Sequence, residues 1–308
     1  MDGAQGPLDN APAKLKKRIV IVGAGGRLGG ALLRAYARHY EVTGFNRAQL
    51  DLVNSDGLRE TLGGMEFDLL INCAAETNVD RCEKEPEEAF RLNAEAPAIL
   101  AKICQQQNAK LVHVSTDYVF DGRKSEPYGE EDEALPVSVY GRSKLEGEQR
   151  ILEASPRHLV IRVSWVFGPE RPSFIDWVIK EAREREQVAA IADKFSTPTY
   201  TVDIAHMLQL LLDREAQGIF HVTSRGQCSW HEYGQWALDC CRRNGIQLRT
   251  QTVDALLLSD MKQFIARRPV SSVLSTEKFA RATGRTPRPW QEAVSDYVRD
   301  FIVSAAPV

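Results

Sequence analysis

The segment RIVIVGAGGRLGGALLRAYARHY, residues 18–40, decides the fold of this chain. A short run of β-branched residues stops at Gly23, a glycine-dense turn follows, and the apolar spacing from Gly30 onward is helical. Glycines at this turn allow a tight bend and let the backbone approach a pyrophosphate, which the free N–H groups at the helix start would bind. Any tight strand-to-helix turn also favours glycine, so the turn alone is weak support. The residues expected to bind a dinucleotide here are Gly23, Gly26, Arg27, Leu28 and Gly29.

Strand-like and helical segments alternate from this turn to about residue 168. The predicted strands are EVTGFN (41–46), FDLLINCAA (67–75), AKLVHVSTDYVF (109–120) and HLVIRVSWVFG (158–168), and PEEAFRLNAEAPAILAKICQQQN (86–108) is a predicted helix. Such alternation predicts an α/β fold in which a Rossmann-type, doubly wound parallel sheet has right-handed crossovers.

The alternation loosens after Gly168. A helix at 173–187 leads to a short strand at 188–193 and a turn, KFSTPTYTVDIA, at 194–205. We therefore expect a nucleotide-binding domain at residues 18–168 plus about 200–222. A smaller mixed α/β region at 169–199 and 223–308 would bind the substrate, and residues 1–17 would be a flexible extension.

The composition excludes several classes of protein. The chain has 308 residues, 43% of them hydrophobic, and a formal net charge of −3, which gives no general attraction to nucleic acid or anionic membranes. No apolar run approaches the roughly 20 residues of a membrane span, and the N-terminus lacks a signal-peptide core. The six cysteines and six histidines show no metal-ligand spacing. We expect a cytoplasmic protein without a metal site.

The end of the second strand indicates which cofactor is bound. NAD enzymes usually carry an acid here that binds the adenosine ribose, but this chain has Asn46 and Arg47. Because arginine pairs with a 2′-phosphate, NADPH is favoured over NADH, although NADH and a merely solvated arginine stay open. Asp51 and Leu52 are expected beside the adenine.

A hydroxyl-rich strand end and a later helix supply candidate catalytic groups. Ser115 and Thr116 lie in the polar C-terminal part of a predicted strand, where side chains face the ligand crevice of a parallel sheet. Tyr140 and Lys144 would lie one helical turn apart, a spacing that also occurs by chance in many helices. Beside a dinucleotide, an ammonium at Lys144 and an oxidised nicotinamide could lower the pKa of Tyr140 from near 10 towards 7, and Tyr140 would act as general acid.

These motifs resemble the extended short-chain dehydrogenase/reductase family, and more narrowly its dTDP-4-dehydrorhamnose reductase group. The Gly-x-x-Gly-x-x-Gly turn, Thr116 and Tyr140-x-x-x-Lys144 match in order and spacing. Further matching blocks include STDYVFDG (115–122), YGRSKLEGE (140–148), RVSWVFG (162–168) and RRPVSSVLST (267–276). The resemblance extends from about residue 18 to residue 295.

The resemblance implies roles that the residues alone do not. Hydride would pass from NADPH to the 4-keto group of a nucleotide-linked deoxysugar, most simply dTDP-4-dehydro-L-rhamnose, and Tyr140 would protonate the oxygen while Thr116 hydrogen-bonds it. Ala74, Ala75, Thr77 and Asn93 would line or support the cofactor site. The substrate would contact Thr116, Asp117, Tyr118, Val119, Trp165 and Arg268.

Three departures from the group's usual pattern put the particular sugar in doubt. Glu76 replaces a tyrosine, Ser173 an asparagine, and Ser196 the glycine of a GSPT turn. An alternative with the same fold is a non-catalytic, NADP-binding regulatory subunit, similar to the beta subunit of methionine adenosyltransferase. A reductase or epimerase of another nucleotide sugar is a second alternative, and a homodimer stays open.

Overall fold

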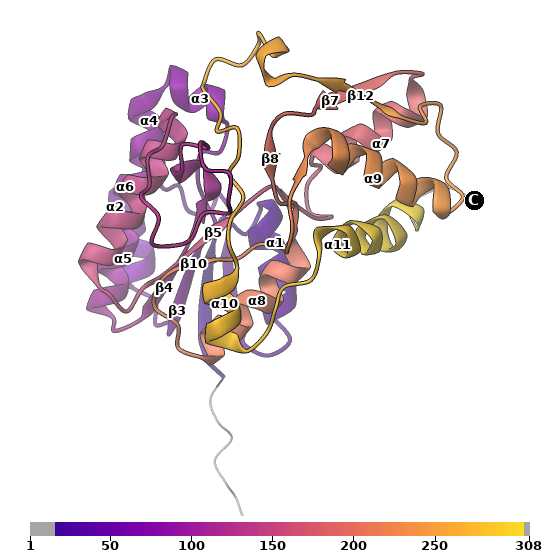
Figure 1. The fold of residues 1–308 in the computed structure, drawn as a ribbon. Helices are drawn as coiled ribbons and strands as arrows, with labels where there is room; N and C mark the ends of the chain where they lie inside the picture. Colours follow the sequence, from indigo (N-terminus) through magenta and orange to yellow (C-terminus); the bar gives the residue numbers. More distant parts are fainter. Residues whose placement is uncertain (1–15, 305–308) are drawn as a thin grey trace, which may run out of the picture.

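A computed structural model describes residues 16–304 of the chain (Figure 1). The expected extension, residues 1–17, lies outside this range except for its last two residues. Within the range, six parallel strands form the main sheet in the order β10-β5-β4-β3-β1-β2. The strands are β1 (Arg18–Val22), β2 (Glu41–Phe45), β3 (Leu69–Asn72), β4 (Lys110–Thr116), β5 (Leu159–Val163) and β10 (Gly218–His221). The prediction of a doubly wound α/β fold is confirmed.

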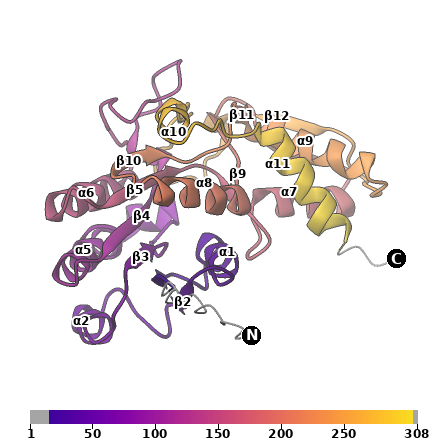
Figure 2. The same ribbon diagram turned by 90° about the horizontal axis from the view of Figure 1, so that it is seen from below.

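Helices cover both faces of this sheet (Figure 2). On β1, Ile19 and Ile21 pack into one core and Val20 and Val22 into another, because successive strand residues point to opposite faces. The first core includes α1 (Arg27–Tyr36) and α8 (Thr201–Asp213). The second includes α2 (Ser55–Gly63), α5 (Ala96–Gln106) and α6 (Val139–Ala154). Burial on both faces explains why β1 is a continuous apolar run.

The helix predicted at residues 86–108 is interrupted. It consists of α4 (Pro86–Phe90), a π-helical turn η1 (Arg91–Glu95) and α5, and it follows the short α3 (Val79–Lys84). Single π turns inside helices often occur at functional sites. This one contains Asn93, whose buried side chain faces the neighbouring loop and α6.

A smaller α/β part lies beside the carboxyl ends of the main strands (Figure 1). Its core is formed by α7 (Phe174–Glu184), α9 (Trp230–Arg243) and α11 (Trp290–Tyr297), with the π turn η4 (Val298–Val303). β7 (Val188–Ile191) pairs in parallel with β12 (Val253–Leu256). The remaining short elements are η2 (Asp117–Val119), β6 (Val166–Phe167), β8 (Phe195–Ser196), β9 (Thr199–Tyr200), β11 (Cys228–Ser229), η3 (Leu258–Asp260) and α10 (Glu277–Thr283).

Other predicted element boundaries also need correction. The turn predicted at residues 194–205 already contains the first residues of α8, whose N-cap is Tyr200 and makes no side-chain cap. Without a Ser, Thr, Asp or Asn cap, the helix start carries no local signal. Three predicted strands are also shorter: the strand at 67–75 ends at Asn72, the strand at 109–120 ends at Thr116, and the strand at 158–168 ends at Val163.

Candidate active site

A cleft of about 1010 Å³ opens where the carboxyl ends of β1, β3 and β4 meet residues of the smaller part. In doubly wound sheets, ligands bind at this edge, where the strand order reverses on either side of the first strand. The predicted residues that line it are Gly23, Gly26, Arg27, Leu28, Asn46, Arg47, Asp51, Leu52, Ala74, Ala75, Thr77, Thr116, Asp117, Tyr118, Tyr140, Lys144 and Trp165.

The glycine turn is as tight as the sequence predicts. Gly23 has a φ of +83°, and a Cβ there would lie 2.7 Å from the backbone nitrogen of Ala74. At Gly29 a Cβ would lie 2.2 Å from the carbonyl oxygen of Gly23. A side chain at either position would therefore separate β1 from β3 or α1 from the turn, and backbone N–H groups could not line the cleft as closely.

Arg27 fixes the far wall of the cleft. Its guanidinium donates to the backbone carbonyl oxygens of Val166 at 3.1 Å, Arg171 at 3.1 Å and Pro172 at 2.5 Å. Arg171 in turn donates to the carbonyl oxygen of Gly25 at 2.8 Å. Burial lowers the pKa of Arg27, and its donors hold the 166–172 loop against the glycine turn.

The end of β2 presents a cation to the cleft. Arg47 is exposed and, among the described residues, makes no hydrogen bond or ion pair with another side chain. The side-chain oxygen of Asn46 is engaged within its own loop, where it accepts from the backbone nitrogens of Ala48 and Gln49. The guanidinium of Arg47 is thus available to an anionic ligand.

Thr116, Tyr140 and Lys144 come together at the centre of the cleft. Thr116 ends β4, whereas Tyr140 and Lys144 lie in the first turns of α6, which begins at a Ser138 cap bonded to the Gly141 nitrogen at 3.2 Å. All three are buried, and Lys144 is only 1% exposed. Its Nζ donates to the carbonyl oxygen of Val114 at 2.7 Å and lies 2.9 Å from Nε2 of His113.

Burial sets the protonation of this group. It raises the pKa of Tyr140, an effect that the nearby Thr116 hydroxyl partly opposes, and it lowers the pKa of Lys144 to about 8. A lowered pKa of Tyr140 is expected only beside a bound dinucleotide, so that expectation stays a prediction. A tyrosine that keeps its proton is nevertheless in the form that a general acid requires.

The Asp117 carboxylate holds the side chain of Thr116 in place. Asp117 is 2% exposed, and its carboxylate accepts from the hydroxyl of Thr116 at 3.1 Å. The other carboxylate oxygen accepts from three serine hydroxyls of distant segments, Ser164 at 3.2 Å, Ser196 at 2.9 Å and Ser272. The buried Asp117 carboxylate thereby connects the end of β4 to the smaller part through hydrogen bonds.

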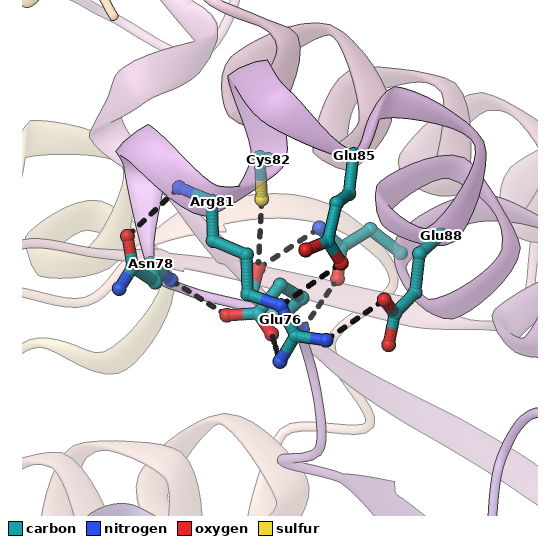
Figure 3. A network of polar contacts seen from close by, with 7 residues as sticks. Glu76, Asn78, Arg81, Cys82, Glu85 and Glu88 are labelled. Atoms are coloured by element: carbon teal, nitrogen blue, oxygen red, sulfur yellow. Dashed lines mark hydrogen bonds and ion pairs between the residues drawn. The ribbon is translucent and has the colours of Figure 1, made fainter. Parts of the chain in front are cut away.

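Glu76 occupies the loop after β3 and is held by Arg81 (Figure 3). One carboxylate oxygen accepts from the Arg81 guanidinium at 3.0 Å and the other from the Asn78 nitrogen at 2.8 Å. Arg81 also binds Glu85 and Glu88. With both oxygens engaged, Glu76 is a structural part of the cleft wall rather than a free base.

An aromatic wall closes the end of the cleft that faces the smaller part. It consists of Trp165, Phe174, Trp230 and Tyr233, whose neighbouring ring centroids are 4.9–6.4 Å apart. Trp165 has a φ of +39°, which is rare for a bulky residue and points to a functional constraint. Buried donors on three of these rings have no partner among the described residues, so the wall offers both stacking surface and hydrogen bonds.

Four predicted residues do not line the cleft, and their contact with a ligand stays a prediction. Gly29 lies beneath the turn, and Val119 packs in a separate core with Phe120. Asn93 supports the loop, because its side chain bonds the backbone N–H and C=O of Glu76 at 2.9 and 3.0 Å. Arg268 is paired with Asp80 at 2.8 Å.

Sequence reasoning missed several groups around the site. His113 precedes Ser115 on the same face of β4, and a polar residue in a buried strand was the available signal. Trp230 and Tyr233 of the aromatic wall, Arg171, and Ser164 and Ser272 around Asp117 carried none, because they come from segments far apart in the sequence. No cluster of three or more metal-ligating side chains occurs among residues 16–304. No helix in the described part of the chain is long and apolar enough to cross a membrane.

The sheet, the glycine turn and the Thr–Tyr–Lys group together define a protein of the extended short-chain dehydrogenase/reductase class. The family model described as the RmlD substrate binding domain matches residues 17–303, and the chain belongs to this family.

Named relatives match over most of their length. The dTDP-4-dehydrorhamnose reductase of Aggregatibacter actinomycetemcomitans is 33% identical over 287 residues, covering 91% of this chain and 97% of the relative. That of Mycolicibacterium smegmatis is 36% identical over 289 residues, covering 92% and 86%. A crystal structure of dTDP-4-dehydrorhamnose reductase from Bacillus anthracis in complex with NADP is 30% identical, with a TM-score of 0.87 over 93% of this chain and 100% of that one.

Proposed function

We propose that this protein is an NADPH-dependent reductase of the 4-keto group of a nucleotide-linked deoxysugar, with dTDP-4-dehydro-L-rhamnose as the first substrate to test. The observation that carries the proposal is the convergence of Thr116, Tyr140 and Lys144 in the cleft that begins at the glycine turn. The names of relatives at 33% and 36% identity support the same substrate.

The residues present fit a dinucleotide phosphate. The glycine turn leaves no space for side chains at Gly23 and Gly29, as close approach of a pyrophosphate requires. Ser115 lines the cleft with a buried hydroxyl that has no partner among the described residues. The exposed guanidinium of Arg47 suits a 2′-phosphate. NADPH, when bound, supplies the hydride.

The chain's own residues then handle the proton. Tyr140 holds its proton because burial raises its pKa, and it delivers that proton to the oxygen of the reduced carbonyl. Lys144, one turn along α6, stabilises the phenolate that forms. Asp117 fixes the position of the Thr116 hydroxyl, and the aromatic wall excludes water from the sugar.

The test is NADPH oxidation followed by absorbance, with dTDP-4-dehydro-L-rhamnose generated in the same tube. Tyr140→Phe should reduce turnover at least about 10²-fold while NADPH still binds. Tyr128→Phe is the matched control, because Tyr128 binds Asp121 through its hydroxyl at 2.7 Å and does not line the cleft. No turnover by the unaltered chain, with NADPH bound tightly, would instead favour a regulatory role or another sugar.

A further inference from the structure

A buried histidine lies directly against the candidate catalytic lysine. His113, in the middle of β4, is 0% exposed and Lys144 is 1% exposed, and the His113 Nε2 and Lys144 Nζ atoms are 2.9 Å apart. The opposite ring nitrogen, Nδ1, lies 3.1 Å from the Asn72 side-chain nitrogen on the paired strand β3. Asn72, His113 and Lys144 therefore form one hydrogen-bonded row beneath the cleft.

The protons of this row can be assigned from its ends. The Asn72 side-chain oxygen accepts from the backbone N–H of Ala74 at 3.0 Å, so the amide nitrogen must face His113. Its N–H donates to Nδ1, which is thus an acceptor. A neutral imidazole has one N–H, and here it must be on Nε2. This N–H points at the Lys144 nitrogen.

The Nε2–H of His113 can donate to the Lys144 nitrogen if Lys144 is a neutral amine, but not if it is an ammonium. A neutral lysine nitrogen has a lone pair that accepts from Nε2–H and still donates to the Val114 carbonyl. A lysine ammonium has three donors and no acceptor. Placing the imidazole proton on Nδ1 instead would not help, because two donors, Nδ1–H and the Asn72 side-chain N–H, would then face each other.

The other groups around Lys144 do not remove this conflict. Glu148 of α6, Cys73 after β3 and Cys82 of α3 influence the charge of Lys144, and the carboxylate of Glu148 is already paired with Arg162 at 2.6 Å. Burial holds the pKa of His113 well below its usual value, so the ring stays neutral. The pKa of Lys144 is about 8, with burial as the main cause.

We propose that His113 is a positioning residue that acts through Lys144, holding its nitrogen in place and disfavouring its ammonium form. The inference rests on the role proposed for Lys144 in reduction. After Tyr140 gives its proton to the substrate oxygen, the Lys144 ammonium gives a proton to the Tyr140 phenolate, which re-forms the Tyr140 O–H and leaves a neutral Lys144 amine. The Lys144 lone pair that results accepts the hydrogen bond from His113 Nε2–H.

The titration of Lys144 tests this directly in the free, full-length protein. Lysine labelled with ¹³C at the ε carbon reports its own protonation by NMR, and Lys144→Met and Lys194→Met assign the two resonances. Lys194 is the internal control. It is also 1% exposed with a pKa lowered to about 8 by burial, but its Nζ lies over the Tyr118 and Trp165 rings at 5.2 and 5.5 Å, without an imidazole.

In His113→Gln the side-chain carbonyl can turn to accept from the Lys144 ammonium. The titration midpoint of the Lys144 amine should rise by about one pH unit or more, which is a tenfold change in proton affinity. The titration midpoint of Lys194 should stay unchanged. His113→Leu, which removes the N–H without adding an acceptor, should move Lys144 in the same direction by less. It serves as the second variant if His113→Gln does not fold.

Two results would overturn the proposal. A lower titration midpoint of Lys144 in His113→Leu than in the wild type would mean that Nε2 of His113 accepts a hydrogen bond from the Lys144 ammonium. If the titration midpoints of Lys144 and Lys194 shifted equally, or if that of Lys144 did not shift, His113 would have a packing role only. Since the titration uses no substrate, a chain without reductase activity would still return one of these answers.

Discussion

Replacing Asp117 by asparagine should destabilise the protein far more than the loss of one surface charge. The carboxylate is buried and accepts four hydroxyl hydrogen bonds, from Thr116, Ser164, Ser196 and Ser272. Hydrogen bonds to a charged group contribute about 1.5–3 kcal/mol each, and neutral ones about 1 kcal/mol. Removing the charge while keeping the shape should therefore cost about 2–4 kcal/mol of unfolding free energy.

Urea unfolding of the wild type and Asp117→Asn measures this loss. Asp121→Asn is the matched control, since its carboxylate also accepts from a hydroxyl, that of Tyr128, but its side chain is 19% exposed. The control should lose about 1 kcal/mol or less. If Asp117→Asn lost no more than Asp121→Asn, the buried carboxylate would not be the charged centre of this network.

The same substitution also tests how Thr116 acts. In the structure its only hydroxyl proton goes to Asp117, so Tyr140 is left as the proton donor to the substrate oxygen. An asparagine can present its amide nitrogen to Thr116 and free that proton. We expect turnover to fall because the neutral amide holds the Thr116 hydroxyl less firmly than the carboxylate does, with NADPH affinity within about threefold of the wild type.

Three further predictions concern the cofactor turn and the core. Arg47→Ala should weaken NADPH binding by about 5- to 30-fold and leave NADH nearly unchanged, as expected for one exposed phosphate contact of about 1–2 kcal/mol; equal losses in titrations with both cofactors would contradict the assignment. Gly29→Ala should cost at least about 2 kcal/mol in urea unfolding, because its Cβ would lie 2.2 Å from the Gly23 oxygen, whereas Gly63→Ala, with nothing within 4 Å, should be nearly neutral. His221, whose pKa burial lowers to about 3, should make stability fall as pH drops below about 6.5, since only the unfolded chain then takes up the proton. Between pH 7 and pH 4.5 the wild type should lose about 2–3 kcal/mol more unfolding free energy than His221→Gln, and parallel losses would refute this.

Local patterns were enough to predict the sheet and the centre of the site. The run of β1 and the glycine turn combine a strand signal with a backbone requirement, and both lie within a few residues. The topology of a parallel sheet places the ends of β1, β3 and β4 at one edge, which is why the sequence alone predicts Thr116 at the cleft. Tyr140 and Lys144 needed only the helical period.

The groups that tune the site could not be predicted in this way. The Asp117 carboxylate and the Ser272 hydroxyl are 155 residues apart in the chain. The contact between His113 and Lys144 depends on how closely α6 packs on β4. No periodicity encodes such distances, because they follow from the packing of whole elements, and the missing cap of α8 shows that even an element can lack a local signal.

The three departures from the family pattern show how the cleft tolerates change. At each position the polar side chain now present is hydrogen-bonded within the protein: Glu76 binds Arg81, Ser173 donates to Asp176 at 2.9 Å, and Ser196 donates to Asp117. A buried polar group that is satisfied internally adds little unpaired charge or donor capacity for a ligand to meet. Choice of sugar should therefore depend more on the unpartnered donors of the aromatic wall than on these three positions. Substitutions such as Trp230→Phe, which keep the ring surface and remove one donor, should change the preference among nucleotide sugars in KM more than in kcat.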